Sequence, residues 1–159
     1  MSDETDSDIP ALDSIPDLEI HDIDLEDFDI PEEEETAVED ESGGSQTFAW
    51  IGSGQGGGRI AKAFYDRGYK KCIAVNTSYH DLDSLDIPIE QRLLLDVGEQ
   101  GAGKDMEKGY EAANKYKQNI FDLMRKIYGG NVDHLYVCVG AGGGSGSGSS
   151  LVLIDIAKK

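Results

Sequence analysis

The stretch VDHLYVCVGAGGGSGSGSS, residues 132–150, decides the fold of this chain. Its first eight residues are mostly apolar and predict a buried β-strand. The eleven that follow are glycine and serine with a single alanine. Glycines between a strand and a helix let backbone N–H groups approach phosphate oxygens, and the helix N-terminus adds partial positive charge. The stretch therefore predicts a loop that binds the phosphates of a nucleotide.

The number of glycines favours this interpretation over a simple turn. Residues 140–148 contain six glycines, more than a strand-to-helix turn requires. Ser145 and Ser147 add hydroxyl donors inside the loop. We expect the following helix to begin at Leu151, where Ser149 or Ser150 can cap it.

Outward from this stretch, short apolar runs alternate with longer helical patterns. Further strands are predicted at residues 47–51, 72–75 and 92–97, and further helices at residues 59–69 and 106–128. The first of these helices should turn Ile60, Ala63 and Phe64 inward. The apolar face of the second consists of Tyr110, Ala113, Tyr116 or Lys117, Ile120, Phe121, Met124 and Ile127. Apolar strands alternating with helices indicate an α/β protein, with a Rossmann-like parallel sheet and helices on both faces.

Glycine clusters follow the first, third and fourth predicted strands, at residues 52–58, 98–103 and 140–148. In an open parallel sheet, the loops after the carboxyl ends of the strands meet at one edge, where ligands bind. We therefore expect the three clusters to form one polyphosphate site, with the positive end of each following helix pointing into it.

Two shorter motifs suggest other interpretations, and both fit less well. A GxGxxG dinucleotide pattern begins at Gly52, but Asn76 follows the second strand where such a site needs an acid for the ribose. Residues 98–104 match the P-loop pattern GxxxxGK, but Asp105 follows where a serine or threonine should hold magnesium. A site that joins all the glycine loops is preferred over both.

The charge of the chain is concentrated in its first 46 residues. The formal net charge is −18, and residues 1–46 carry 19 of the 32 acids and none of the 14 basic residues. Single apolar residues among so many carboxylates cannot bury enough area to offset the entropy of ordering. We predict a disordered acidic tail over residues 1–46, either a solubilising segment or a contact for a protein partner. The folded domain should occupy residues 47–159.

Composition also disfavours several classes of function. The basic residues of the folded part do not gather into a patch, so no nucleic-acid partner is expected. No run reaches the roughly 18 apolar residues of a membrane span, and the N-terminus lacks the basic and apolar regions of a secretory signal. We expect a cytoplasmic protein. Cys72 and Cys138 should be buried, reduced thiols, and neither a disulfide nor a metal site is predicted.

Four motifs, in order, resemble those of the tubulin/FtsZ family of GTPases. The segment GAGGGSGSGSS, residues 140–150, resembles the tubulin signature GGGTGTG or GGGTGSG, with serine in place of threonine. The segments GQGGGRI (54–60), AVNTS (74–78) and GAGKDMEKG (101–109) resemble the first, second and third phosphate loops. The likeness covers residues 47–159. It implies an incomplete GTPase domain that binds GTP or GDP, with Mg²⁺ held mainly by the nucleotide.

The resemblance also implies a role for each loop. Four residues of the first loop are expected to pack under the phosphates, namely Gly54, Gln55, Gly56 and Gly57. Asn76 should lie near phosphate or ribose, and Arg59 takes a position near the base where relatives usually carry Asn or Gln. Those expected to face the terminal phosphate are Gly101, Ala102 and Gly103. Those expected to hold the inner phosphates are Gly142, Gly143, Gly144, Ser145, Gly146 and Ser147.

The family's domain continues with two more strands, a long central helix and an acidic loop that activates water on the neighbouring subunit's nucleotide. We find none of these in the 159 residues and expect no GTP hydrolysis by this chain alone, hence no catalytic residue here. When complete, such a protein would assemble head to tail into a cytoskeletal filament. The alternative is a non-catalytic adaptor that joins a filament or partner through its acidic tail.

Overall fold

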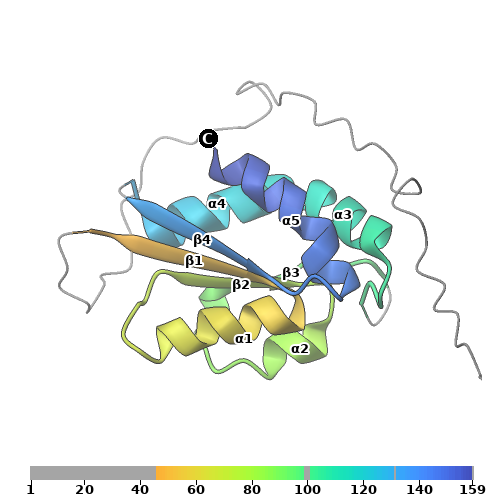
Figure 1. Cartoon of the computed structure of the whole chain (residues 1–159), viewed down its shortest axis with the longest axis horizontal. Helices are drawn as coiled ribbons and strands as arrows, with labels where there is room; N and C mark the ends of the chain where they lie inside the picture. The colour runs from red at the N-terminus through yellow and green to blue at the C-terminus, as the bar shows by residue number, and fades with distance from the viewer. Residues whose placement is uncertain (1–45, 99–100, 131, 159) are drawn as a thin grey trace, which may run out of the picture.

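The computed structural model describes residues 46–98, 101–130 and 132–158. Its parallel sheet consists of β1 (Phe48–Ser53), β2 (Cys72–Asn76), β3 (Arg92–Leu94) and β4 (His134–Val139). The strands lie in the order β3-β2-β1-β4 (Figure 1). The predicted α/β class and parallel sheet are confirmed. The predicted acidic tail lies outside the described residues except for Gln46.

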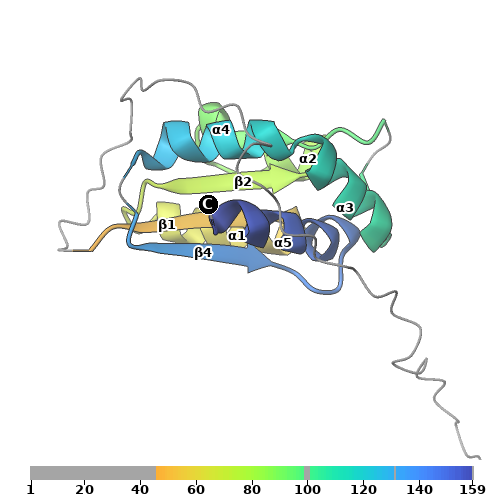
Figure 2. The same ribbon diagram turned by 90° about the horizontal axis from the view of Figure 1, so that it is seen from above.

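The strand β1 lies in the interior of the sheet, because it pairs with β2 on one side and with β4 on the other. Trp50 is in register with Cys72 of β2 on one side and with Tyr136 of β4 on the other. Within the sheet of described strands, β4 lies at an edge (Figure 2). Its residues are accordingly exposed or only partly buried, and Tyr136 is 47% exposed. Cys72 is buried as predicted, but Cys138 is only partly buried because it lies on this edge strand.

Helices cover both faces of the sheet. On one face lie α1 (Gly54–Tyr65) and the short α2 (Tyr79–Asp83). On the other lie α3 (Met106–Lys115), α4 (Lys117–Tyr128) and α5 (Gly144–Ala157) (Figure 1). A single 3-10 turn, η3 (Ile89–Gln91), precedes β3.

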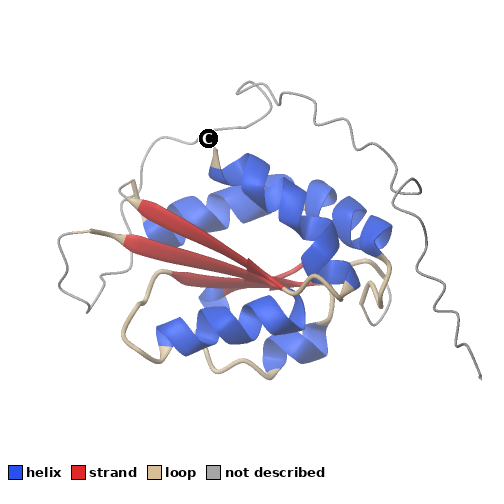
Figure 3. Cartoon of the chain, viewed as in Figure 1, coloured by secondary structure: helices blue, strands red, loops and turns tan. Residues whose placement is uncertain are grey.

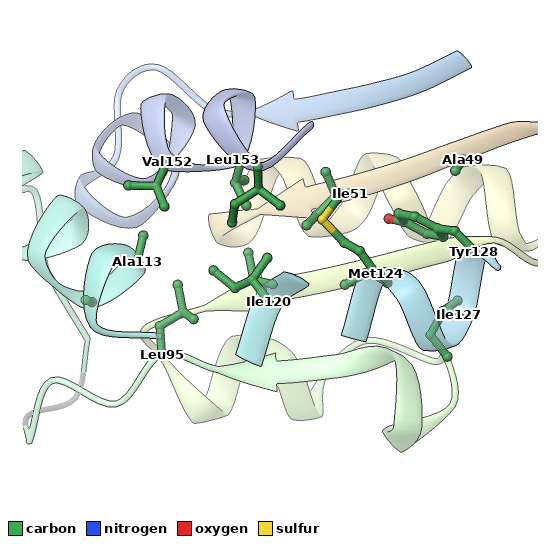
Figure 4. Packing of buried hydrophobic residues seen from close by; sticks show 14 residues of the cluster. Ala49, Ile51, Leu95, Ala113, Ile120, Met124, Ile127, Tyr128, Val152 and Leu153 are labelled. Carbon is green, nitrogen blue, oxygen red and sulfur yellow. The ribbon is translucent and has the colours of Figure 1, made fainter. Parts of the chain in front are cut away.

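The larger core fills the space between the sheet and the helices α3, α4 and α5. Figure 4 shows side chains of α4 and α5, including Ile120, Met124 and Leu153, pointing toward Ile51 of β1. The predicted apolar face of residues 106–128 is confirmed, since Ala113, Ile120, Met124 and Ile127 are buried in this core. On the opposite face, Trp50 stacks on the Phe64 ring at 4.6 Å between centroids.

Two predicted helices have different bounds. The first begins at Gly54, five residues before the predicted start, and ends at Tyr65 rather than at residue 69. Ile60 is consequently 44% exposed and Ala61 is fully buried in its place. Residues 106–128 form two helices, because the backbone of Tyr116 leaves the helical conformation at φ −99° and ψ 16°.

A membrane-spanning helix and a metal site are two features that the sequence does not predict. In the described ranges, no helix combines the length and the apolar composition needed to cross a bilayer. Among the same residues, no three His, Cys, Asp or Glu side chains lie close enough together to hold a metal ion.

Candidate functional site

The turn from β1 into α1 brings a helix N-terminus directly to the end of the central strand. Ser53 ends β1 and is fully buried, and α1 begins at the next residue. Gly54 has φ +70°, a left-handed conformation that favours glycine. The Ser53 hydroxyl does not cap α1, because it hydrogen-bonds the Ser149 hydroxyl at 2.6 Å. The first turn, GQGG, carries no acid, so its N–H groups and positive dipole end suit an anion.

The turn from β4 into α5 also brings a helix N-terminus without a side-chain cap to the end of a strand. α5 begins at Gly144 rather than at the predicted Leu151, and its N-cap is Gly143, which has no side chain to act as a cap. The loop itself is therefore only residues 140–143. Ser149 and Ser150 lie inside the helix and do not cap it, which corrects the prediction. Figure 3 shows the strand arrowheads pointing toward the loops from which α1 and α5 start.

Several of the glycines in this stretch serve helix packing. A Cβ atom on Gly144 would lie 2.5 Å from the Asp105 carbonyl oxygen, and one on Gly148 would lie 2.5 Å from the Tyr110 nitrogen. Both contacts are with the backbone at the start of α3 and in its first half. α5 can thus approach α3 closely only without side chains at these positions. Close packing of α5 against α3 therefore explains some of the glycines that we predicted to bind phosphate.

The two open helix N-termini lie against one another. A Cβ atom on Gly54 would lie 3.0 Å from the Gly146 nitrogen, so the first turns of α1 and α5 touch through backbone. A Cβ atom on Gly56 would lie 3.7 Å from the Gly140 Cα atom. The first and fourth loops, 82 residues or more apart in sequence, therefore form one surface. Two helix dipoles direct their positive ends toward it.

The third helix differs from these two. The Asp105 carboxylate caps α3 by accepting hydrogen bonds from the Glu107 and Lys108 N–H groups at 3.0 and 3.1 Å. The expectation that the helix after the third loop adds its positive end to the site is therefore wrong, because this end is occupied by a carboxylate. The cap also explains why an acid stands where a P-loop has serine or threonine.

Side chains of the second loop stabilise the loop itself. Asn76 is buried, and its Oδ1 accepts a hydrogen bond from the Ser78 N–H at 3.1 Å. Asp81 accepts weak hydrogen bonds from Asn76 Nδ2 at 3.3 Å and from Gln55 Nε2 at 3.5 Å. These contacts join the second loop to the first turn of α1.

Thr77 is a residue that sequence analysis missed, although it lies inside the AVNTS segment. Its Oγ1 accepts a hydrogen bond from the Ala102 N–H at 2.9 Å and lies 2.5 Å from the Ser145 Oγ. One buried hydroxyl thus connects the second, third and fourth loops. The Gly103 carbonyl adds a second tie by accepting a hydrogen bond from the Gly144 N–H at 3.2 Å.

The remaining predicted residues lie at the rim. Arg59 is exposed on α1, and Gly142 and Gly143 are exposed in the loop before α5. The Ser147 hydroxyl donates to the Ala141 carbonyl at 2.7 Å and so holds this loop against the helix. The structure places the predicted site residues at the carboxyl edge or in the first turns of α1 and α5, except Arg59, which lies in the second turn of α1. Their contacts with a nucleotide remain a prediction.

Among the described residues, two groups have shifted pKa values: the Tyr128 hydroxyl at the end of α4 and the Cys138 thiol, one residue before the end of β4. Burial raises the pKa of the Tyr128 hydroxyl well above its usual value, with smaller contributions from Cys72 and Cys138. That hydroxyl donates to the Trp50 carbonyl at 2.8 Å. Burial also raises the pKa of the Cys138 thiol.

The fold and this edge define an α/β domain whose ligand side is formed by glycine loops at the carboxyl ends of parallel strands. The family model described as "Tubulin/FtsZ family, GTPase domain" matches residues 47–159. The chain belongs to this family. A search of the curated proteins found no match.

Solved structures of family members superpose on the chain. CetZ1 from Haloferax volcanii, a GDP-bound monomer, is 36% identical with a TM-score of 0.62, covering 68% of this chain and 36% of that one. CetZ2 from Haloferax volcanii, a GTPγS-bound protofilament, is 29% identical with a TM-score of 0.58, covering 66% and 34%.

TubZ from Bacillus thuringiensis serovar israelensis, a GTPγS-form protofilament, is 25% identical with a TM-score of 0.59, covering 71% and 33%. The chain therefore spans about a third of the length of these three relatives.

Proposed function

We propose that this chain binds a guanine nucleotide through its phosphates at the carboxyl edge of the sheet. The observation that carries the proposal is the contact between two helix N-termini, at Gly54 and Gly146, neither of which has a side-chain cap or an acid in its first turn. Their N–H groups and dipoles would hold the inner phosphates, with the Ser145 hydroxyl as a further donor, while the Ser147 hydroxyl, which donates to the Ala141 carbonyl, would hold the loop in place.

The third loop would complete the site on the terminal-phosphate side. Gly101 and Gly103 have φ values of +119° and +61°, and the loop reaches α5 through the Gly144 N–H. Guanine is supported by the GDP and GTPγS bound to the family members above. Mg²⁺ would be held mainly by the nucleotide, and Arg59 would lie near the base.

Assembly and hydrolysis belong to the proposal only for a complete protein. CetZ2 and TubZ form protofilaments, and this chain spans about a third of each. We infer a head-to-tail, filament-forming protein of the cytoplasm that hydrolyses GTP once the rest of the domain is supplied, because phosphoryl transfer needs a positioned water as well as a phosphate cradle.

Titration of the chain with fluorescent mant-GTP and mant-ATP tests the binding proposal. Saturable binding of mant-GTP, at least tenfold tighter than mant-ATP, is expected. The variant Gly146→Ala should lose binding, because its Cβ would lie 3.0 Å from both the Gly140 nitrogen and carbonyl oxygen. Gly130→Ala is the matched control, since a Cβ there meets no described atom within 4 Å. A folded wild type without saturable binding contradicts the proposal.

A second candidate function is that of an adaptor. The acidic residues 1–46 lie outside the matched range 47–159, and their charge would favour a basic partner. Pelleting with a full-length family member, with and without residues 1–46, separates the two functions. Co-sedimentation that needs the tail and ignores nucleotide supports the adaptor.

A further inference from the structure

Thr77 occupies the junction of three loops. It is 2% exposed, and its hydroxyl oxygen contacts both the Ala102 N–H of the third loop and the Ser145 hydroxyl at the start of α5. We propose that Thr77 is a positioning residue that holds the third loop ready for a terminal phosphate, so that the site prefers a nucleoside triphosphate over a diphosphate. This inference rests on the proposed function.

The third loop needs such an anchor because of its composition. Ala102 stands between Gly101 and Gly103, and glycine loses more conformational freedom on ordering than any other residue. The second half of the loop is held by two backbone hydrogen bonds, from Asp105 N–H to the Ala102 carbonyl at 3.0 Å and from Gly144 N–H to the Gly103 carbonyl. Thr77 adds a side-chain hydrogen bond at the Ala102 N–H.

This bond turns the Ala102 N–H inward and so fixes the peptide groups on either side. Ala102 itself is 4% exposed, whereas Gly103 is exposed and a Cβ on it would meet no described atom within 4 Å. The open side of the loop is therefore presented by Gly103 and not by Ala102. A loop already held in this form has less entropy to lose when a phosphate arrives.

The Thr77 hydroxyl lies between the third loop and the fourth, and it can accept from the Ala102 N–H whichever way the proton between Thr77 and Ser145 points. A threonine hydroxyl has one proton to donate and two lone pairs that accept. When Thr77 accepts from Ala102 and donates to Ser145, the Ser145 proton is free to donate to a phosphate oxygen. An anion beside Ser145 favours this arrangement over its reverse. Occupation of the inner phosphate position and anchoring of the third loop then share one atom.

The ratio of dissociation constants for GDP and GTPγS, measured on the full chain, tests the proposal. Thr77→Val keeps the side-chain shape but removes the acceptor, and it should lower the preference for GTPγS by roughly tenfold, the effect of one or two lost hydrogen bonds. Thr77→Ser should restore the preference. Ser145→Ala keeps the Thr77 bond to Ala102, so it should weaken both nucleotides to a similar degree and leave the ratio within about twofold.

Amide hydrogen exchange supplies a readout that needs no nucleotide. The Ala102 amide should be protected in the wild type, and Thr77→Val should speed its exchange by roughly tenfold or more. A ratio unchanged in Thr77→Val, or an unprotected Ala102 amide in the wild type, overturns the proposal. If the wild type binds neither nucleotide while Ala102 is protected, the proposed function and the triphosphate preference fail together, but the loop anchor stands.

Discussion

Substitution of Gly148 by alanine tests whether the glycines of α5 serve packing. A Cβ atom there would overlap the Met106 carbonyl oxygen and lie 2.5 Å from the Tyr110 nitrogen, both of them backbone atoms of α3. Ordinary Cβ contacts begin at 3.4 Å, so α3 and α5 must separate by about 1 Å. Such overpacking costs about 3 kcal/mol when the obstacle is backbone and cannot rotate away.

The helix propensity of alanine opposes this cost. Alanine is about 1 kcal/mol better than glycine in a helix interior, which leaves a net destabilisation of about 2 kcal/mol. For a folded part of this size the melting temperature should fall by roughly 8 °C. Thermal unfolding followed by circular dichroism measures the shift. The control Gly142→Ala, whose Cβ meets no described atom within 4 Å, should change stability by less than about 0.5 kcal/mol. A Gly148→Ala variant as stable as the wild type, or more stable, would refute the packing argument.

Three further predictions concern positions away from the α3 contact. Ser149→Ala should lower the free energy of unfolding by about 1 to 2 kcal/mol, because it leaves the fully buried Ser53 hydroxyl without its 2.6 Å partner; chemical denaturation that detects no loss contradicts this. Tyr136→Lys should reduce self-association in light scattering, because a lysine on an exposed edge strand opposes pairing with a second sheet, and unchanged scattering at equal concentration would count against it. Burial raises the Cys138 pKa, so at pH 8 its thiolate fraction and alkylation rate should lie below those of a free thiol and rise with pH; alkylation as fast as that of a free thiol would contradict this.

The strands β1 and β2 were predictable from sequence because their burial is continuous. β2 is buried at every residue, and β1 at every residue but Phe48, so their apolar runs stood out against polar flanks. The strand β4 pairs with β1 in parallel at an edge of the described sheet. The exposure of Tyr136 was not predictable from periodicity, since a run such as HLYVCV reads the same on an edge as in the centre of a sheet.

The helix starts were missed for a physical reason. Glycine is a poor helix former, and the residues from Gly54 and from Gly144 are assigned to loops by any rule based on propensity. Their helical conformation depends on tertiary contact: a Cβ on Gly57 would overlap the Cys138 carbonyl, and one on Gly148 the Met106 carbonyl. The same contacts explain why the position of Thr77 could not be inferred, since its partners lie 25 and 68 residues away.

The glycines of residues 140–148 therefore serve both helix packing and the loop before α5, and different positions serve each. Gly144 and Gly148 face α3, and Gly146 faces Gly140 and the Ser53 carbonyl. Because these three positions have no side chain, the first turns of α5 can pack closely against the end of β1. Gly142 remains exposed in the loop before the helix. Because the close approach of α5 is what places its N-terminus beside that of α1, packing creates the geometry that we propose binds the phosphates. Substitutions facing α3 should act on stability first and on nucleotide affinity through it, whereas a substitution at Gly142 should act on affinity alone.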